Sequence, residues 1–365
     1  MSDFEVVIVG GGLAGLLCAR SLLESGFEGS RIALMDDAKG HGRGSDAPCA
    51  ICHPFPGKSF QLRPHVLEAF MKAQSLFRSL PDDLSRQTKV QRLLSEHFSH
   101  NDRLERSFDR IRTELPHWLK VKEVSAPSII PDHVERVIEV EPAWVVDLAG
   151  LCAYLRERLI SQNVTVFSKA MITMKRHHSR WQINGDELCG TRVILSVGSQ
   201  LTRLFPYLKS QIIWGHLLGL GGVNDELDIL VGEGHLTSWQ KGVWGGATFL
   251  PQDEPPSLHQ EKDSLAVLEG KLARFYSDIQ SSHSQWKGAR LVLGKERLPI
   301  AGAVPYLNEV YCLAGGGASG LLWLPYLSAC LSQEIIENNQ TIPQALRTDR
   351  LSIEEWGPST EMIQA

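Results

Sequence analysis

Three glycines near the N-terminus have the spacing of a nucleotide-binding turn. Gly10, Gly12 and Gly15 spell G-x-G-x-x-G, and the apolar run 6–9 comes directly before them. In such a turn the first glycine permits a tight bend, the second lets the backbone approach a pyrophosphate, and the third lets a helix pack closely on a strand. The start of that helix offers free N–H groups and a partial positive charge to the phosphates. The pattern therefore predicts a dinucleotide site.

An acidic pair follows at the distance expected for binding an adenosine ribose. The apolar run 32–35 ends at Asp36, and Asp37 is the competing candidate. A carboxylate about 20 residues beyond the glycine turn accepts hydrogen bonds from the ribose hydroxyls. The glycines and the acidic pair together do not distinguish FAD from NAD.

Cys49, Cys52 and His53 form a C-x-x-C-H pattern, which is typical of c-type haem attachment. Haem attachment of this kind needs export, and the N-terminus shows no signal peptide, so we exclude it. A redox-active cysteine pair is a second interpretation. A metal site is excluded because no second pair of ligands follows. The simplest interpretation is a coincidental spacing, and we expect no bound metal.

A basic cluster follows in the middle of the chain. A positive stretch of this kind either contacts an RNA backbone or forms the solvated edge of a sheet. The sequence leaves both interpretations open. Its members are Lys169, Lys175, Arg176, His177, His178 and Arg180.

The composition excludes several classes of protein. The 365 residues contain 37 Lys plus Arg and 42 Asp plus Glu, so the formal net charge is −5 and the pI is about 6.2. This balance argues against a protein whose whole surface binds nucleic acid, and we expect no DNA partner. No run of about 18 apolar residues is present, so we expect no membrane span. Seven cysteines form no evident disulfide framework, which indicates a reducing, cytoplasmic location.

The elements that must position these groups are strands and helices in an α/β arrangement. The first strand, the glycine turn and the second strand form a βαβ unit. A β-meander and a β-rich region follow, and the C-terminal part returns to α/β character. We expect strands at 6–9, 32–35, 164–167, 170–174, 181–183, 192–197, 212–220, 242–250 and 310–314, and helices at 16–25, 64–80, 148–161, 258–280 and 321–338.

The ordered landmarks of the whole chain resemble the D-amino-acid-oxidase (DAO) superfamily of FAD-dependent oxidoreductases. They are the glycine turn, the loop 45–54, the strand end 195–198, and the run 298–302 followed by 314–320. The chain is most similar to the FAD-dependent domain of the enzymes for tRNA 5-methylaminomethyl-2-thiouridine biosynthesis. That closer resemblance rests on Gly-His-Leu-Thr at 234–237, Gly-Ala-Thr at 246–248 and Leu-Pro-x-x-Gly-x-Val-Pro at 298–305.

The resemblance implies an α/β + β fold: a Rossmann-like FAD-binding domain of the glutathione-reductase type, intertwined with a β-sheet-rich substrate domain. On this basis we expect the FAD-binding domain at 1–80, 145–205 and 297–345, the substrate domain at 81–144 and 206–296, and a C-terminal tail at 346–365.

The resemblance also implies which residues contact FAD. The loop around Ser45 and Ala50 would contact the flavin, Met171 would lie on the strand whose backbone meets the adenine, and Val197 and Gly198 would close the second nucleotide-facing strand. The C-terminal glycine turn would present N–H groups to the flavin N1–C2=O edge, where reduction places negative charge. The full expected set is Gly10, Gly12, Leu13, Ala14, Gly15, Asp36, Asp37, Ser45, Ala50, Met171, Val197, Gly198, Gly316, Gly317, Ser319, Gly320, Leu321 and Leu322.

Two histidines are implied on the substrate side, namely His53 beside the flavin and His216 on a strand that lines the substrate in this family. Solvent exposure is the alternative for each.

A cation for a substrate carboxylate should precede Pro299. The family register falls on Leu291, with Arg290 one residue earlier. Strand parity would place Lys295 and Arg297 on one face and Arg290 on the other, unless a bulge intervenes. We rank Lys295 first and Arg290 second.

The implied activity is oxidation of a C–N bond next to a carboxylate, with hydride transfer from the α-carbon of a neutral amine to FAD. The resemblance suggests carboxymethylaminomethyl-uridine at the tRNA wobble position as substrate, converted to aminomethyl-uridine. The chain begins directly at the glycine turn, so we expect no methyltransferase half and only the oxidative step. A free amino acid or an N-substituted glycine is the alternative substrate, and a non-catalytic flavin-binding module is a third possibility. The sequence does not indicate an oligomeric state.

Overall fold

The computed structural model describes residues 2–37, 42–57, 61–95, 107–111, 114–126, 130, 134–171, 173–185, 187–220, 227–240, 242–274, 282–357 and 362–364. The chain divides into two units, each built from separate pieces of sequence. Unit 1 comprises residues 1–46, 149–213 and 289–365, and unit 2 comprises 47–148 and 214–288. Residues 47–80 thus fall in unit 2, whereas the sequence boundaries place them with the FAD-binding domain.

Buried parallel strands form the centre of unit 1, in the order β7-β2-β1-β10-β18. These strands are largely apolar because helices cover both faces of a parallel sheet. The register pairs Val9 with Met35 and with Leu195, so the carboxyl ends of β1, β2 and β10 meet at one edge. The strands predicted at 32–35 and 310–314 are confirmed. The bounds are β1 Ser2–Val9, β2 Ile32–Met35, β7 Thr165–Phe167, β10 Leu188–Leu195 and β18 Val310–Ala314.

Antiparallel strands extend this sheet, including the predicted meander, in which β8 pairs with β9 and β9 with β10. The strand predicted at 170–174 is wrong in its position, because β8 begins at Thr173. Asn184 accounts for the difference, since its side-chain amide donates to the Ala170 carbonyl (2.9 Å) and takes the place of a strand partner. The bounds are β8 Thr173–His177, β9 Arg180–Ile183, β17 Ile300–Ala303 and β19 Met362–Gln364.

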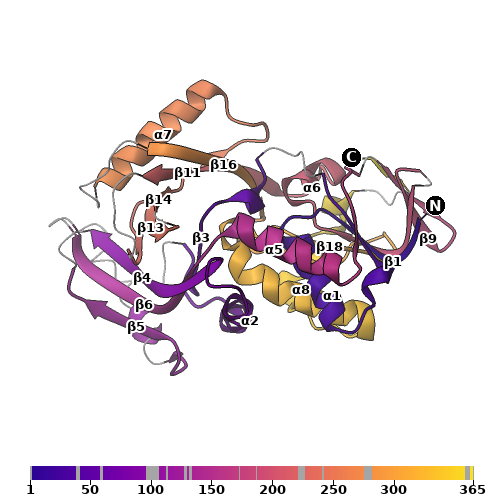
Figure 1. Cartoon of the computed structure of the whole chain (residues 1–365), viewed down its shortest axis with the longest axis horizontal. Coiled ribbons are helices and arrows are strands. Elements are labelled where there is room, and N and C mark those ends of the chain that lie inside the picture. The colour runs from indigo at the N-terminus through magenta and orange to yellow at the C-terminus, as the bar shows by residue number, and fades with distance from the viewer. Residues whose placement is uncertain are drawn as a thin grey trace. The chain divides into compact units, whose positions relative to one another are not determined.

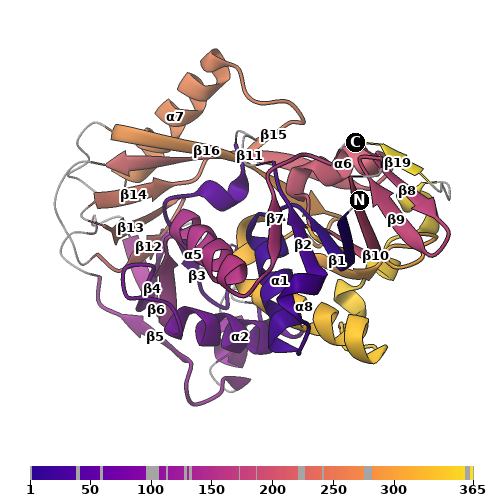
Figure 2. The same cartoon turned by 45° about the vertical axis from the view of Figure 1, so that its right-hand side comes forward.

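Two helices of unit 1, α1 and α8, pack side by side (Figures 1 and 2). Small residues allow the close approach: the buried Ser21 and Ser328 hydroxyls lie 3.2 Å apart. The helix predicted at 148–161 is confirmed as α5. The bounds are α1 Leu13–Glu24, α5 Leu148–Ser161, α6 Leu201–Leu204 and α8 Gly320–Glu337.

The C-terminal segment belongs to unit 1 and is not a separate tail. Trp356 is buried and packs edge-on against Phe205, with ring centroids 5.0 Å apart. Arg350 donates to the Leu298 carbonyl (2.6 Å). These contacts bury apolar surface that an isolated tail would leave exposed.

Unit 2 is built on one long, mostly antiparallel sheet in the order β15-β11-β14-β13-β12-β4-β6-β3, with β16 paired to β11 and β5 to β6 (Figure 2). The strand predicted at 242–250 ends at Gly246 in the structure, and the predicted helix 258–280 is α7, which ends at Ala273; residues 275–281 lie outside the described residues. The bounds are β3 Ala50–Cys52, α2 Val66–Arg78, β4 Ser85–Ser95, β5 Lys120–Val124, β6 Val134–Val146, β11 Ser210–Leu220, β12 Ile229–Val231, β13 His235–Trp239, β14 Gly242–Gly246, β15 Leu250–Pro251, α7 Leu258–Ala273 and β16 Ser282–Leu293.

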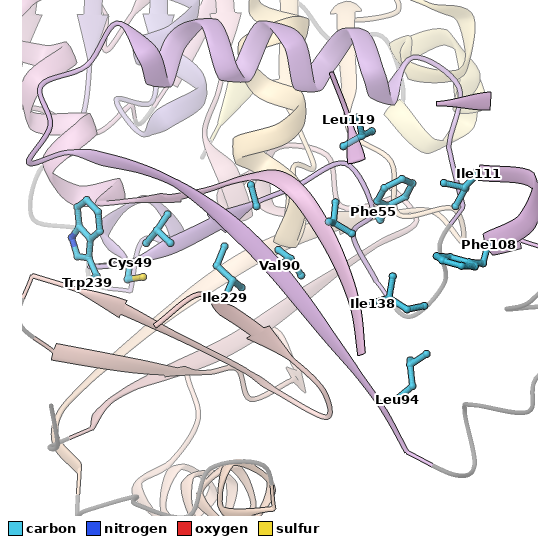
Figure 3. Packing of buried hydrophobic residues seen from close by; sticks show 13 residues of the cluster. Cys49, Phe55, Val90, Leu94, Phe108, Ile111, Leu119, Ile138, Ile229 and Trp239 are labelled. Carbon is cyan, nitrogen blue, oxygen red and sulfur yellow. The ribbon is translucent and has the colours of Figure 1, made fainter. Parts of the chain in front are cut away.

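The two faces of this sheet bury different apolar clusters. One face packs against α7 and includes Leu93 and Leu236, together with Leu268 and Leu272 of the helix. The opposite face carries the cluster drawn in Figure 3, with Cys49 and Trp239 towards one end and Phe55, Phe108 and Ile111 towards the other. Alternate residues of a strand project to opposite faces of the sheet. The cluster that a residue belongs to therefore identifies the face on which its side chain lies. Among the described residues, no helix combines the length and apolarity needed to cross a membrane.

Candidate functional site

The glycine turn of unit 1 has no room for side chains. Gly10 adopts a left-handed conformation (φ +101°), and a Cβ on it would overlap the Ser196 carbonyl oxygen. A Cβ on Gly15 would overlap the Gly10 carbonyl oxygen, and one on Gly12 would lie 2.9 Å from Ser45 Oγ. The turn therefore allows the close approach of backbone that a pyrophosphate site needs.

Asp36 lies at the carboxyl end of β2, beside this turn. Its buried carboxylate accepts the Gly11 N–H (3.0 Å) and a hydrogen bond from Arg43 (3.1 Å), and it also pairs with Arg156. The neighbouring Asp37 is exposed. The geometry thus favours Asp36 over Asp37 as the ribose-binding residue.

Sequence reasoning missed both arginines. Arg43 lies two residues before the predicted flavin loop 45–54 and could have been noticed there. Arg156 comes from α5, more than a hundred residues from Asp36, and no local pattern links them.

Ser45 contacts the N-terminus of α1. Its hydroxyl accepts the Leu13 N–H (3.0 Å), and Leu13 and Ala14 form the first turn of the helix. The N-cap residue of α1 is Gly12, which has no side chain to accept hydrogen bonds from the N–H groups at the start of the helix. The structure therefore brings Ser45 to the glycine turn, as expected, whereas Ala50 belongs to β3 of unit 2.

Two expectations about strands in the FAD set are wrong. Met171 precedes β8 and does not lie on a strand. Val197 and Gly198 follow β10, which ends at Leu195. Ser196 donates its hydroxyl to the carbonyls of β1 and the glycine turn (3.0 and 2.9 Å), and Gly198 has a left-handed conformation (φ +58°) that a strand cannot continue through.

The C-terminal glycines form the predicted turn between β18 and α8. Gly317–Ser319 is a short 3-10 turn, and α8 follows at Gly320 with no side-chain cap at Ser319. The free N–H groups at the start of α8 are thus available to an anionic ligand. Leu321 and Leu322 are buried in the first turn of this helix.

The last residues of β16 approach two glycine-containing segments, one at Gly44 and one at Gly317. A Cβ on Gly44 would lie 3.7 Å from Arg290 Cγ, and one on Gly317 would lie 3.5 Å from a Val292 methyl. Arg43, just before the predicted flavin loop, also forms a bridge to Ala289. Arg290 is thus adjacent to the segment that leads into this loop, and burial lowers the pKa of its guanidinium.

The parity argument for the other two cations is wrong. β16 ends at Leu293, and Gly294 (φ +60°) starts a turn that contains Lys295 and Arg297. Strand alternation does not apply in a turn, and both side chains are exposed. The structure therefore favours Arg290 over Lys295.

His53 is buried in unit 2, just after β3. Its Nδ1 accepts the Phe55 N–H (3.3 Å), so a neutral ring carries its proton on Nε2. Burial, with a smaller effect from Arg92 and His235, lowers the pKa of His53 to about 3. At neutral pH, His53 is consequently an uncharged hydrogen-bond donor.

His216 lies on the other face of the unit 2 sheet. It is buried on β11, two residues from Leu218 of the cluster that packs against α7, and its Nδ1 lies 2.6 Å from the Thr248 hydroxyl. Burial lowers the pKa of His216, and Glu261 of α7 opposes this effect. The structure does not bring His216 and His53 together.

The C-x-x-C-H pattern lies in a buried part of unit 2. Cys49 and Cys52 are both free and buried, and burial raises the pKa of Cys49 to about 12. Each is thus a neutral thiol at physiological pH. Among the described residues, no group of three or more His, Cys, Asp or Glu side chains is arranged to hold a metal ion.

Several side chains of the basic cluster pair with other groups of the protein. Lys169 pairs with Glu187 (3.0 Å), and Arg180 pairs with Asp3. Arg176 donates to the Asn308 carbonyl (2.9 Å) and covers the Trp181 ring. These contacts support the interpretation as a solvated sheet edge.

The residues of unit 1 fit a bound FAD. The carboxyl ends of its parallel strands meet the crowded glycine turn and the buried Asp36 carboxylate at one edge of the sheet, which is where such folds bind dinucleotides. The uncapped start of α8 supplies further N–H groups.

Comparison with known proteins agrees with this geometry. A family model described as "DAO: FAD dependent oxidoreductase" matches residues 5–334. The tRNA 5-methylaminomethyl-2-thiouridine biosynthesis bifunctional protein MnmC of Marinobacter nauticus is 25% identical over 95% of this chain. The chain spans 58% of the length of that relative.

Solved structures with the same fold include two oxidases. Iminodiacetate oxidase (IdaA) of Chelativorans sp. BNC1 has a TM-score of 0.76 at 17% identity and covers 94% of this chain and 98% of its own. Glycine oxidase of Geobacillus kaustophilus has a TM-score of 0.79 at 18% identity and covers 93% and 96%.

Proposed function

The chain belongs to the DAO family of FAD-dependent oxidoreductases, and we propose that it oxidises a C–N bond of an amine that carries a carboxylate. FAD supplies the hydride acceptor when bound. Unit 1 would hold FAD, with the glycine turn, Ser45 and the start of α8 around its phosphates and flavin, and Asp36 at its ribose. Val197, Gly198, Gly316 and Gly317 of unit 1 would also contact FAD.

One observation carries the substrate proposal: Arg290 is a half-buried cation beside the segment that leads into the predicted flavin loop. A carboxylate that leaves water needs a charge-assisted partner, and a guanidinium can bind both of its oxygens. Arg290 would thus hold the α-carboxylate and orient the neighbouring C–N bond. The substrate nitrogen reacts in its neutral form. Because the hydrogen on the adjacent carbon leaves as a hydride to the flavin, no strong base is required to abstract it.

Two substrate classes contain this chemical group. The similarity to the tRNA-modifying relative supports carboxymethylaminomethyl-uridine in tRNA, with aminomethyl-uridine as product. The partnered charges of the basic cluster favour a free amino acid or an N-substituted glycine, because a tRNA-binding surface needs cations available to phosphates. We favour the small substrate. All seven cysteines are free, which supports a reducing compartment such as the cytoplasm.

Anaerobic flavin reduction tests the proposal. The purified protein should be yellow with FAD, and glycine, sarcosine or iminodiacetate should bleach the flavin. If only tRNA carrying carboxymethylaminomethyl-uridine bleaches it, the macromolecular substrate is correct. A protein that takes up NAD and no flavin, or a flavin that none of these compounds reduces, would contradict the proposed activity.

A further inference from the structure

Arg43 lies beside the glycine turn of unit 1, in the segment just before the predicted flavin loop. A Cβ on Gly12 would lie 2.9 Å from Ser45 Oγ and 3.9 Å from Arg43 Nη2. In a turn of this kind the second glycine lacks a side chain so that the backbone can approach a pyrophosphate. The Ser45 hydroxyl and the Arg43 guanidinium therefore line the side of Gly12 on which a pyrophosphate is expected.

The backbone around Arg43 is fixed by contacts within unit 1. The N–H of Ala289 in β16 donates to the Gly42 carbonyl (2.8 Å). The Ser45 hydroxyl accepts the Leu13 N–H (3.0 Å), which ties the same segment to the start of α1. Because both ends of this short segment are held, Arg43 is in place before a ligand binds, and less conformational entropy is lost on binding.

The Arg43 guanidinium uses only part of its hydrogen-bonding capacity within the protein. Nη1 donates to Asp36 Oδ2 (3.1 Å), and Nε lies 3.9 Å from Asp46 Oδ1. Among the described residues, Nη2 has no hydrogen-bond partner. The side chain is 23% exposed, so a ligand can reach it. The N–H groups of Nη2 are therefore available to an anion beside Gly12.

A second arginine holds the Asp36 carboxylate. Arg156 of α5 pairs with Asp36 and also donates to the Gly11 carbonyl (3.4 Å). The Gly11 N–H donates to the other carboxylate oxygen of Asp36 (3.0 Å). A Cβ on Gly11 would lie 2.8 Å from Arg156 Nη2, so Arg156 lies on the Gly11 side of the turn and Arg43 on the Gly12 side. Arg156 and the Gly11 N–H thus suffice to hold Asp36, and this task does not require a second guanidinium.

We propose that Arg43 binds the pyrophosphate of FAD, while its Nη1 stays on Asp36. The inference rests on the FAD-binding part of the proposed function and not on the substrate. The N–H groups of the turn and of α1 carry only partial positive charges, whereas a guanidinium supplies a full charge and parallel donors that match phosphate oxygens. Because Asp36 is the ribose-binding residue of the proposed site, Arg43 would connect the ribose contact with the pyrophosphate contact.

Competition against FAD tests this assignment with two ligands, ADP and adenosine. Both contain the ribose, and only ADP contains the two linked phosphates. Each is titrated as a competitor while the protein without FAD takes up FAD, which is followed by fluorescence quenching. Arg43→Met and Arg43→Gln should weaken ADP binding by about 10- to 100-fold and change adenosine binding by less than about 3-fold. Arg43→Lys, which keeps the charge, should recover part of the affinity for ADP.

Arg156→Gln is the matched control, because Arg156 pairs with the same carboxylate. Its loss should weaken ADP and adenosine by the same factor, since both ligands reach Asp36 through the ribose. If Arg43→Met and Arg43→Gln also leave the ratio between the two affinities at the wild-type value, Arg43 acts only through Asp36 and the proposal is overturned.

Phosphorus NMR of the FAD-loaded protein decides the case in which adenosine competes too weakly to be measured. The phosphorus resonances of bound FAD should shift in Arg43→Gln and stay at their wild-type positions in Arg156→Gln. Unshifted resonances in Arg43→Gln, or equal shifts in both variants, would refute the contact. These measurements use no amine, so a failure of the proposed oxidation would not alter their result.

Discussion

Gly15→Ala is the sharpest test of the glycine turn. A methyl group at this position would overlap the Gly10 carbonyl oxygen and lie 2.7 Å from Ser196 Oγ. The obstacle cannot rotate away, because Gly10 N–H donates to the Met35 carbonyl (2.8 Å) and the Ser196 hydroxyl donates to Gly10 O (2.9 Å). Helix α1 must therefore move away from β1.

The expected change in the free energy of unfolding of Gly15→Ala follows from two opposing effects. Alanine in place of glycine inside a helix stabilises it by about 0.5–1 kcal/mol, whereas overpacking typically costs about 1–3 kcal/mol. Since fixed backbone is the obstacle at Gly15, we expect the upper part of this range and a net destabilisation of about 1–2 kcal/mol. A displaced helix start also moves its phosphate-facing N–H groups, so the Kd for FAD should rise by about 10-fold or more.

Gly270→Ala provides the matched control. Gly270 is exposed in α7, and a Cβ there would meet nothing within 4 Å. Replacing this glycine by alanine should therefore stabilise the protein. Urea unfolding of the apoprotein and titration of FAD by fluorescence quenching measure both effects. If Gly15→Ala unfolds at the same urea concentration as Gly270→Ala and binds FAD like the wild type, the argument from crowding is refuted.

Four other predictions follow from the described contacts. Arg290→Met should retain FAD but lower kcat/KM for flavin reduction by about 30- to 1000-fold, whereas Lys295→Met should stay near wild type; equal values for both would exclude Arg290 as the carboxylate ligand. Asp36→Asn should raise the Kd for FAD about 10-fold in an equilibrium titration, because a charge-assisted acceptor for the ribose is lost. Cys49 should react with a thiol reagent such as iodoacetamide only as the protein unfolds, since burial raises its pKa to about 12, and fast native-state labelling would contradict this. The pKa of His53 falls from 6.5 to about 3 on folding, so the native state binds this proton more weakly than the unfolded chain does. The free energy of unfolding is therefore highest above pH 6.5 and falls as the pH falls towards 3, by up to about 1.4 kcal/mol per pH unit. His53→Gln should flatten that dependence in urea unfolding curves.

The nucleotide site could be predicted from the sequence because the residues that form it are close together in the chain. A buried strand, a glycine turn and a helix lie within the first 25 residues, and each spacing reflects contacts between near neighbours. Asp36 could be predicted for the same reason, since it directly follows the next strand. The choice of Asp36 over Asp37 needed the structure, which buries the first and exposes the second.

The candidate substrate residues depended on where strands end and how they pair. Lys295 was ranked first because it matches a basic position of the family without a register slip. The strand parity used beside that argument fails, because β16 ends at Leu293. His216 and His53 both lie in unit 2, but only the sheet register shows that His216 faces α7.

The sequence by itself determined the βαβ unit and its dinucleotide-binding turn, because short-range spacing encodes a turn that backbone crowding makes specific to glycine. The family and FAD came from the resemblance of the ordered landmarks along the whole chain. Only the tertiary structure brought Arg156 to Asp36 and Arg290 to Gly44. These pairs join distant segments, and a side chain's direction depends on strand ends and pairing register, which no local pattern specifies.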